Sequence, residues 1–421
     1  MATATIKLLS TEQIITAELE IMNNIRNGIW INSKNEKITL FPYNENNLYF
    51  CFENDEKIIG KEVTIKIWDS YTIYNRNLFL WSKKYKINNT RNRIKIEDLS
   101  SLFRYGFDYK KEKEKVGILN LYVSIEFEKE EFIFPKEKEN YLTIHFIQFI
   151  PRIMEAQSPK WIVASKFQNF WFREEANSEP WKRPILNELS LDWVLNFGRQ
   201  EIQETYENLI HNLWKTPNAI KELKKMIKRM TEDPFIKLEI PLKEEQTIPF
   251  GVRSSEIKTY DSVPQPKLNG ALKKETMPLF ERFYYTSVSY RITDLKKFDF
   301  SEPLDDLFGT LASFSFHVLA IGSITKKEKN YSIKITEIGI YIKDSFDFIT
   351  DNEPLGHWSF YYNSIYRINP LSLAYYFEIT NKSYRDYRKD YKKGSDFTIY
   401  SDIKYIPVNY TFISSYEEIS K

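Results

Sequence analysis

The stretch Phe314-Ser-Phe-His-Val-Leu-Ala-Ile321 and the charged turn Lys326-Lys-Glu-Lys-Asn330 that follows it decide the fold class of this chain. Apolar and polar side chains alternate in the stretch, and the pattern continues in Tyr331-Ser-Ile-Lys-Ile335 and Ile338-Gly-Ile-Tyr-Ile-Lys343. A period of two is typical of antiparallel strands with one buried face, and a short polar run between two such strands predicts a hairpin. We therefore predict a C-terminal antiparallel β-sheet or barrel-like domain over residues 279–421.

The N-terminal third shows the same alternation, for example in Val63-Thr-Ile-Lys-Ile-Trp68 and in Asn47-Leu-Tyr-Phe-Cys-Phe52. Strands of this length separated by polar turns predict an immunoglobulin-like β-sandwich over residues 1–150, which we interpret as an adaptor domain. Cys51 is the only cysteine, so it has no disulfide partner within the chain and is expected to be a buried core thiol.

The period changes to three and four residues after Pro151, which predicts a helical segment over residues 151–243. Ser158-Pro159 is expected to begin one helix, the run from Leu186 to Phe197 continues the helical period, and Thr216-Pro217 begins another helix. Periodicity is lost over residues 244–278, where several prolines predict an irregular linker. The fold class expected for the whole chain is α+β, mainly β.

Composition excludes several classes of function. Of 421 residues, 60 are Lys or Arg and 58 are Asp or Glu, so the formal net charge of +2 supplies no field for non-specific nucleic-acid binding. No nucleic-acid partner is expected, although a nuclease stays the third and weakest alternative. The 12 glycines include no phosphate-binding glycine motif, which removes the main support for Rossmann and P-loop folds.

The N-terminus lacks a basic segment followed by an apolar core, and the chain contains no run of 18 apolar residues. Neither a secretory signal nor an ordinary transmembrane helix is therefore expected. We expect synthesis in the cytoplasm and, if the protein is exported, a route that needs no signal peptide.

Polar residues that could carry chemistry gather between residues 341 and 402. Asp344 and Asp347 stand where a strand is expected to end, and His357 follows in a turn-rich segment. Carboxylates at a strand end could bind a divalent cation such as Mg²⁺, and nearby arginines could hold a phosphate. The predicted catalytic residues are Asp344, Asp347, His357, Arg385 and Arg388, and the predicted metal ligands are Asp344, Asp347 and Asp396.

Two alternatives stay open at this level. Aspartates are common at strand ends because they bond turn backbone, and Asp–Arg pairs often only tie loops together. The helix expected after Pro217 has apolar residues on one face and lysines and Arg229 on the other. Such a helix could lie on an anionic membrane or could simply present a solvated face of a packed helix.

Several ordered motifs over about residues 150–412 resemble an uncharacterised bacterial domain family that is typically encoded near type VI secretion spike and PAAR genes. The motifs are Pro151-Arg-Ile-Met, Trp161-Ile-Val-Ala-Ser-Lys-Phe-Gln-Asn-Phe-Trp-Phe172, Leu191-Asp-Trp-Val-Leu-Asn-Phe-Gly-Arg199, Ile338-Gly-Ile-Tyr-Ile-Lys-Asp-Ser-Phe-Asp-Phe348, Leu355-Gly-His-Trp358, Tyr384-Arg-Asp-Tyr-Arg388, Gly394-Ser-Asp-Phe397 and Ser401-Asp402. The resemblance implies a toxin carried by a contractile secretion system. It implies no proven activity.

A shorter segment is similar to colicin M-type bacteriocins, which cleave the lipid-linked peptidoglycan precursor. Asp344-Ser-Phe-Asp347 matches the two aspartates of their Asp-x-Tyr-Asp motif, but Phe346 replaces the tyrosine. His357 lies farther downstream than the histidine of that family and is followed by Trp358 instead of arginine. The arginine could come only from elsewhere, and Arg385 and Arg388 are the candidates.

These observations predict an antibacterial effector that hydrolyses a phosphodiester or pyrophosphate bond of a lipid-linked cell-wall precursor in the target cell envelope. The expected partners are a secretion spike, PAAR or tube protein and a cognate immunity protein. The alternative is a non-enzymatic protein, either a membrane-perturbing toxin or a structural cargo of the spike.

Overall fold

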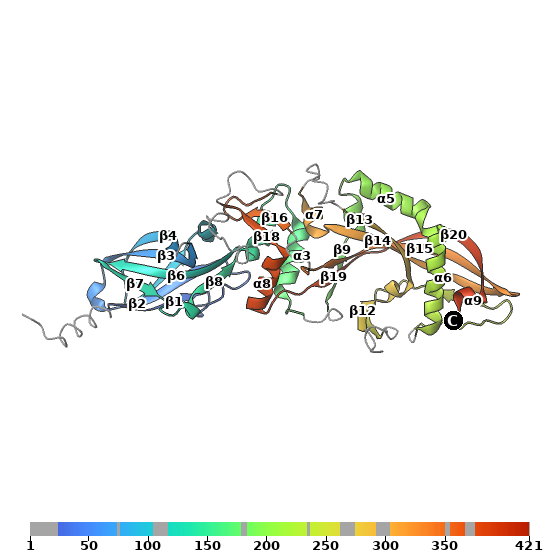
Figure 1. The fold of residues 1–421 in the computed structure, drawn as a ribbon, viewed down its shortest axis with the longest axis horizontal. Helices are drawn as coiled ribbons and strands as arrows, with labels where there is room; N and C mark the ends of the chain where they lie inside the picture. The colour runs from blue at the N-terminus through green and yellow to red at the C-terminus, as the bar shows by residue number, and fades with distance from the viewer. Residues whose placement is uncertain are drawn as a thin grey trace, which may run out of the picture. The chain divides into compact units, whose positions relative to one another are not determined.

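A computed structural model describes residues 24–73, 76–103, 117–177, 183–233, 236–261, 274–291, 304–349, 354–366 and 375–420 (Figure 1). The chain divides into two compact units. The first consists of Met1–Lys160 and Ile349–Lys393, and the second of Trp161–Phe348 and Gly394–Lys421. Both units are thus built from segments that are distant in sequence. The predicted boundaries after residues 150, 243 and 278 do not coincide with this division.

Two antiparallel sheets form the sandwich of the first unit. The smaller sheet has the order β1-β2-β5, and the larger has the order β4-β3-β6-β7 with β8 paired to β6. The strands are β1 (Ile25–Ile31), β2 (Leu48–Asn54), β3 (Glu62–Ile73), β4 (Arg76–Lys86), β5 (Arg91–Ile96), β6 (Ile118–Phe127), β7 (Glu130–Phe134) and β8 (Leu142–His145). Short 3-10 turns follow several of them, including η5 (Phe146–Phe149), which leads into α2 (Ile150–Glu155).

The alternation in β2 decides which residues enter the sandwich core. Leu48, Phe50 and Phe52 are buried, and the ring centroids of Phe50 and Phe134 lie 6.5 Å apart across the two sheets. Cys51 falls on the other face of the strand and is only half-buried. Its expected place in the core was wrong, because a one-residue step along a strand moves a side chain to the opposite face.

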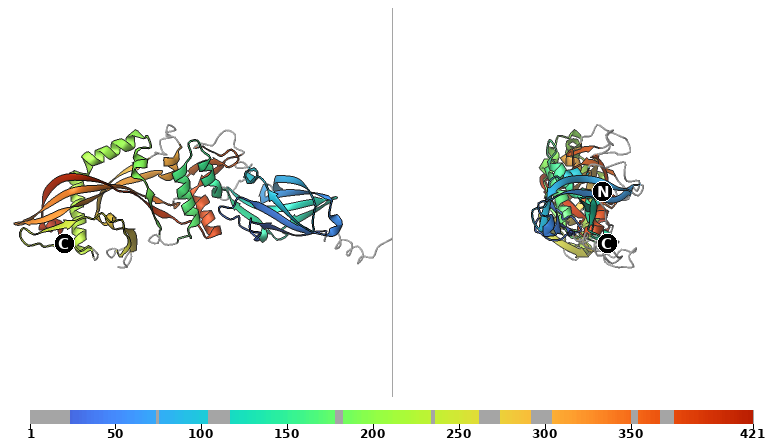
Figure 2. Two further views of the ribbon diagram at one scale, coloured as in Figure 1. Left: turned by 180° about the vertical axis from the view of Figure 1, so that it is seen from behind. Right: turned by 90° about the vertical axis from the view of Figure 1, so that its left-hand side faces the viewer.

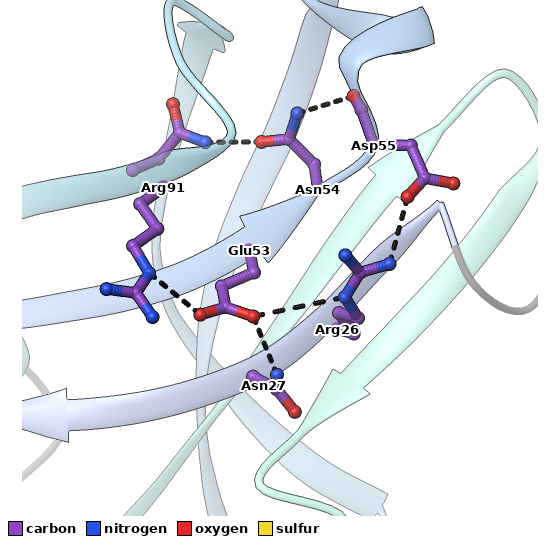
Figure 3. A network of polar contacts seen from close by, with 7 residues as sticks. Arg26, Asn27, Glu53, Asn54, Asp55 and Arg91 are labelled. Carbon is purple, nitrogen blue, oxygen red and sulfur yellow. Dashed lines mark hydrogen bonds and ion pairs between the residues drawn. The ribbon is translucent and has the colours of Figure 1, made fainter.

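An exposed polar network ties the β1, β2 and β5 strands together at one end of the sandwich (Figure 3). Glu53 accepts hydrogen bonds from Asn27 at 2.7 Å and from Arg91 at 2.9 Å, and Arg26 pairs with Asp55 at 2.9 Å. Hydrogen bonds from Asn27 and Arg91 hold the pKa of the Glu53 carboxyl below its usual value. Exposed pairs of this kind contribute little stability, so we interpret the network as fixing strand register.

The first unit is completed by a segment that leaves the second unit after β15 and returns before β19. It carries the sheet β17-β16-β18, formed by β16 (Pro354–Ser359), β17 (Ser364–Tyr366) and β18 (Phe377–Thr380), and the helix α8 (Asn381–Tyr391). Aromatic rings join it to the end of the sandwich: Phe146 stacks on Phe377 with centroids 4.6 Å apart, and Phe149 stacks on Phe360 at 4.4 Å.

A seven-stranded sheet forms the second unit, with the path β10-β14-β15-β19-β9, β13 paired to β14 and β20 paired to β15. Its strands are β9 (Ile185–Leu189), β10 (Thr247–Phe250), β13 (Tyr284–Arg291), β14 (Ser313–Lys327), β15 (Asn330–Phe346), β19 (Phe397–Ser401) and β20 (Lys404–Ser415). All pairs are antiparallel except β19 with β9. The hairpin expected at Lys326–Asn330 joins β14 and β15, with Glu328 in the left-handed conformation.

The two alternating segments expected on either side of Thr336 form the single strand β15. A shift of register between Ile335 and Glu337 bulges the strand against β20, which lets both segments keep their apolar residues buried. Tyr341 and Lys343 then face one side of the sheet, and Asp344 and Phe346 face the other. This alternation separates two sets of polar side chains that are adjacent in sequence.

Besides this sheet, the second unit contains helices, several of which contact its strands (Figures 1 and 2). They are α3 (Ile162–Arg173), α4 (Leu191–Leu195), α5 (Gln200–His211), α6 (Pro217–Glu232), α7 (Asp306–Thr310) and α9 (Tyr416–Ile419). The helix start expected at Thr216-Pro217 is confirmed, because Thr216 is the N-cap of α6 and its side chain accepts a hydrogen bond from Ala219 N–H. Among the described residues, no helix is long and apolar enough to cross a membrane.

Other expectations for this middle region were wrong. α3 begins after Trp161 instead of after Ser158. Residues Leu186–Leu189, which were expected to be helical, lie in strand β9 because they pair with β19 at the edge of the sheet. The expected linker contains β10, β11 (Ile257–Asp261) and β12 (Lys274–Pro278), while residues 262–273 with two of its prolines lie outside the described residues. Tertiary pairing overrides weak local periodicity in such segments. The fold class is α+β, mainly β.

The apolar face of α6 is packed inside the protein. Leu223, Met226, Ile227 and Met230 are all buried, and the helix contacts β13 and α9. Within the described structure, the accessible face of the helix is the lysine-rich one. The solvated-face interpretation of this helix is therefore confirmed, and in this fold the apolar residues are not available for insertion into a membrane.

Candidate functional site

The predicted site residues are divided between the two units. Asp344 and Asp347 at the end of β15 and Asp396 just before β19 belong to the second unit. His357 in β16 and the two arginines of α8 belong to the first unit. Neither unit alone brings the whole set together, so the two groups are described separately.

In the second unit, a guanidinium joins two of the three aspartates. Arg183 Nη1 donates a hydrogen bond to Asp347 Oδ2 at 3.1 Å, and Arg183 Nη2 lies 4.0 Å from Asp396 Oδ2. The side chains of Arg183 and Asp347 are about one-fifth exposed, so solvent still reaches this pair. The guanidinium that pairs with Asp347 belongs to the segment before β9. A role for Arg385 or Arg388 of α8 stays a prediction.

Asp396 mainly holds the structure around it. Its Oδ1 accepts a hydrogen bond from Trp171 Nε1 at 3.2 Å, and its backbone exchanges hydrogen bonds with the Asn177 side chain. Gly394, with φ +99°, lies against Trp171 so closely that a Cβ there would stand 2.3 Å from the Trp171 ring. These contacts hold α3 against the start of β19, so Asp396 has a structural role in joining the two elements.

The carboxyl of Asp344 lies in an environment that disfavours its charged form. Burial raises the pKa of its carboxyl to about 7, a hydrogen bond from Ser345 N–H opposes that rise, and the negative charge of Asp347 adds to it. Near neutral pH a partly protonated carboxyl thus stands beside a carboxylate that pairs with Arg183. A pair whose environments differ in this way is the usual arrangement for general acid–base chemistry.

The first-unit members of the predicted set lie on different elements. His357 stands in the middle of β16, opposite Tyr366 of β17 and Glu378 of β18, so the expected turn around it is a strand. Its Nδ1 is buried without a hydrogen-bond partner among the described residues. Arg385 and Arg388 lie one turn apart on α8, and Arg385 donates a hydrogen bond to the carbonyl of Ile349.

The described residues contain no group of three or more His, Cys, Asp or Glu side chains with the geometry to hold a metal ion. Between Asp347 and Asp396, the position expected for a cation is spanned by the guanidinium of Arg183. Magnesium binding at the predicted ligands stays a prediction.

A second polar cluster lies on the opposite face of β15 and was missed by the sequence analysis. Glu281, in the 3-10 turn η9 (Leu279–Phe283), is buried and accepts hydrogen bonds from Tyr341 and from Lys343 Nζ, the latter at 2.6 Å. Burial raises the pKa of Glu281, although the charge of Lys343 opposes this. A buried carboxylate held by a lysine and a tyrosine is stable only as a complete network.

His317 borders the same cluster. Its Nδ1 lies 3.9 Å from Glu281 Oε1, beyond hydrogen-bond distance, and has no partner among the described residues. Burial, followed by the charge of Lys343, lowers the pKa of His317 to about 3, so the imidazole is neutral. The ring of Tyr284 packs over it with centroids 4.4 Å apart. Period-two alternation placed His317 in a strand correctly but gave no information about this neighbour.

A groove of about 350 Å³ lies between α6 and β13 next to this cluster. It is lined by Glu222, Lys225, Met226, Arg229, Tyr284, Tyr285, Thr286 and Ser287. The size is in the range of small-ligand pockets. In the sequence, the groove is indicated only by the basic face of the helix after Pro217. That pattern gives the positive charges of one wall, but it does not predict that β13 forms the other wall.

Comparison with known proteins places the chain in a family but assigns no activity. Residues 146–413 match the model of a family of unknown function, DUF6402. No curated protein and no solved structure matches the chain. The matched region contains both polar clusters of the second unit and the groove, and it covers well over half of the chain. The protein belongs to the DUF6402 family.

Proposed function

We propose that this protein is an antibacterial effector carried by a contractile, type VI-like secretion apparatus. On this proposal it hydrolyses a phosphodiester or pyrophosphate bond of a lipid-linked cell-wall precursor in the envelope of the target cell. A spike, PAAR or tube protein would carry it, and an immunity protein would protect the producing cell.

The observation that supports hydrolysis is the pair of unlike carboxyl groups at the end of β15. Asp344, with its pKa near 7, can accept a proton from an attacking water molecule when it is ionised. The water oxygen then forms a bond to phosphorus, the bond to the leaving oxygen breaks, and that oxygen takes up a proton. Arg183, held by Asp347 at 3.1 Å, supplies a positive charge beside that member of the pair.

A test in living cells uses the full chain directed to the periplasm of a susceptible bacterium by an added signal sequence. We expect the wild-type chain to arrest growth, and Asp344→Asn and Asp347→Asn to lose most of that effect. Asp192→Asn is the matched control, because Asp192 is an exposed carboxylate of the same unit whose partner Lys404 lies 3.4 Å away. Equal toxicity of wild type and Asp344→Asn, both expressed at equal level, would remove the hydrolase proposal.

The purified protein tests the substrate and the cation together. Incubation with the lipid-linked precursor should release a water-soluble, phosphate-bearing product, and Asp344→Asn should release at least about 100-fold less, the usual effect of losing a general base. Parallel reactions with Mg²⁺ and with EDTA decide whether the carboxylates act through a cation. A toxic protein that releases no product in either condition would point to the alternative, a structural or membrane-directed cargo.

The membrane-perturbing alternative depends on a helix that could lay its apolar face on lipid. In the described structure that face of α6 is buried by β13 and α9. No other described observation favours it, so we keep the hydrolytic effector as the proposed function.

A further inference from the structure

The geometry points to a second site in the same unit: we propose that the groove between α6 and β13 binds the phosphate group of a small phosphorylated ligand through Arg229. The proposal does not depend on the hydrolytic function. Asp344 and the Glu281 cluster that borders the groove lie on opposite faces of β15, so one bound phosphate could not contact both.

Among the described residues, Arg229 has no carboxylate within ion-pair distance, although the charges of Glu281 and Glu275 act on it from farther away. Its Nη2 donates hydrogen bonds to the carbonyl oxygens of Arg282 at 3.0 Å and Tyr284 at 3.2 Å. These bonds orient the guanidinium, but a carbonyl does not neutralise it. The neighbouring Arg282 is different, because Asp233 pairs with it directly. Arg229 therefore offers at the wall of the groove an oriented positive charge that no carboxylate contacts directly.

The surroundings of Arg229, which is itself an exposed residue of α6, support this assignment. Desolvation lowers the pKa of Arg229, which means that the surroundings weaken the hydration of its charge. A partly desolvated cation gains from an anion, and a phosphate can accept two parallel hydrogen bonds from the planar guanidinium. The remaining N–H groups of Arg229 are available for such a pair within the described structure.

Other groups of the groove suit a phosphate and a small organic part. Lys225 adds a second positive charge, although Glu222 lies 2.6 Å from it, and Ser287 and Thr286 offer hydroxyl groups on β13. Met226 and Tyr285 also line the groove, although both are almost fully buried. A volume of about 350 Å³ leaves room for a ligand larger than phosphate itself.

The buried cluster behind the groove keeps the arginine in place. Glu281 and Tyr284 stand at the turn from η9 into β13, whose carbonyls hold Arg229. Tyr341 and Lys343 of β15 anchor Glu281, and the ring of Tyr284 packs on His317. We therefore interpret Glu281 as a positioning residue for the groove, with no direct contact to the ligand.

The test titrates the full chain with inorganic phosphate, pyrophosphate and phosphorylated small molecules, and measures heat or tyrosine fluorescence. Sulfate at the same ionic strength controls for unspecific anion binding. We expect phosphorylated ligands to bind more tightly than sulfate, and Arg229→Gln to weaken their binding at least about tenfold. Arg229→Lys keeps the charge and loses the planar fork, so it should bind with intermediate affinity.

Lys221→Gln is the matched control, because it removes the same charge from an exposed position of α6 outside the groove. It should change affinity less than about twofold, as expected for screened surface charge. Equal losses of affinity in Lys221→Gln and Arg229→Gln would overturn the proposal. The proposal would also fail if the wild-type protein bound phosphorylated ligands no more tightly than it binds sulfate. Near-UV circular dichroism checks that the variants are folded. If Arg229→Gln is not folded, the comparison of Arg229→Lys with Lys221→Gln decides.

Discussion

At the scale of single residues, the two faces of strand β15 carry two different clusters of polar side chains. Tyr341 and Lys343 enter the Glu281 cluster, whereas Asp344 faces the opposite side beside Asp347. The aspartates can be predicted from the sequence, because carboxylates at a strand end form a local pattern. Glu281 cannot, because 60 or more residues separate it from its partners on β15 and no local period predicts such a contact.

The raised pKa of Asp344 predicts a pH-dependent stability. In the unfolded chain its carboxyl ionises near pH 4, but in the folded protein it keeps its proton up to about pH 7. Between these values the folded state binds more protons, so the free energy of unfolding falls as pH rises and is lowest above pH 7. Asp344→Asn removes the cost of the buried charge.

We expect Asp344→Asn to raise the free energy of unfolding at pH 8 by on the order of 1–2 kcal/mol and to change it little near pH 4. Urea denaturation at both pH values measures this, with Asp192→Asn as the exposed control. A gain of equal size at pH 4 and pH 8 would contradict the assigned titration.

At the scale of elements, α3 depends on a distant carboxylate for its N-terminus. Its own N-cap, Trp161, offers no side-chain acceptor. Instead, Asp306 of α7 accepts hydrogen bonds from Val163 N–H at 3.0 Å and Ala164 N–H at 2.7 Å. Local capping residues alone predict that Ser158 and Pro159 start this helix, because a cap supplied by a distant residue leaves no local pattern in the sequence.

Asp306→Ala should therefore destabilise the second unit by about 1–2 kcal/mol, the usual cost of losing an N-terminal cap. Asp306→Asn keeps one acceptor oxygen and should lose less. Thermal melting monitored at the helix signal measures the difference. The control is Asp192→Ala on exposed α4, expected within about 0.5 kcal/mol of wild type. Equal melting of Asp306→Ala and wild type would show that the contact does not cap α3.

At the scale of the whole molecule, each compact unit is formed by two separate parts of the chain. In the first unit, the end of the sandwich packs on a segment that follows it by about 200 residues in sequence: His145 Nε2 lies 2.9 Å from Asp390 Oδ2, and Phe146 stacks on Phe377. A boundary drawn after residue 150 or 160 would expose these aromatic faces.

We expect the fragment of residues 1–160 to melt at a lower temperature than the same fragment joined by a flexible linker to residues 349–393. Complete burial of Phe146 and Phe149 is worth about 1.5–3 kcal/mol each, and the fragment loses the part that Phe377 and Phe360 provide, because Phe103 still covers both rings. The isolated fragment should also bind a hydrophobic dye that the joined form does not bind. Identical melting and no dye binding by the fragment would show that the sandwich is complete without the later segment.

The sequence by itself determined the mainly β class, the sandwich strands, the long hairpin of β14 and β15, and the start of α6. Each of these depends on local period or on a cap a few residues away. Only the tertiary structure decided that β9 is a strand beside β19, that Arg183 is the partner of Asp347, and that Glu281 lies against Lys343. Strand pairing joins residues that are far apart in sequence, and neither register nor strand order is encoded in the period of a single strand.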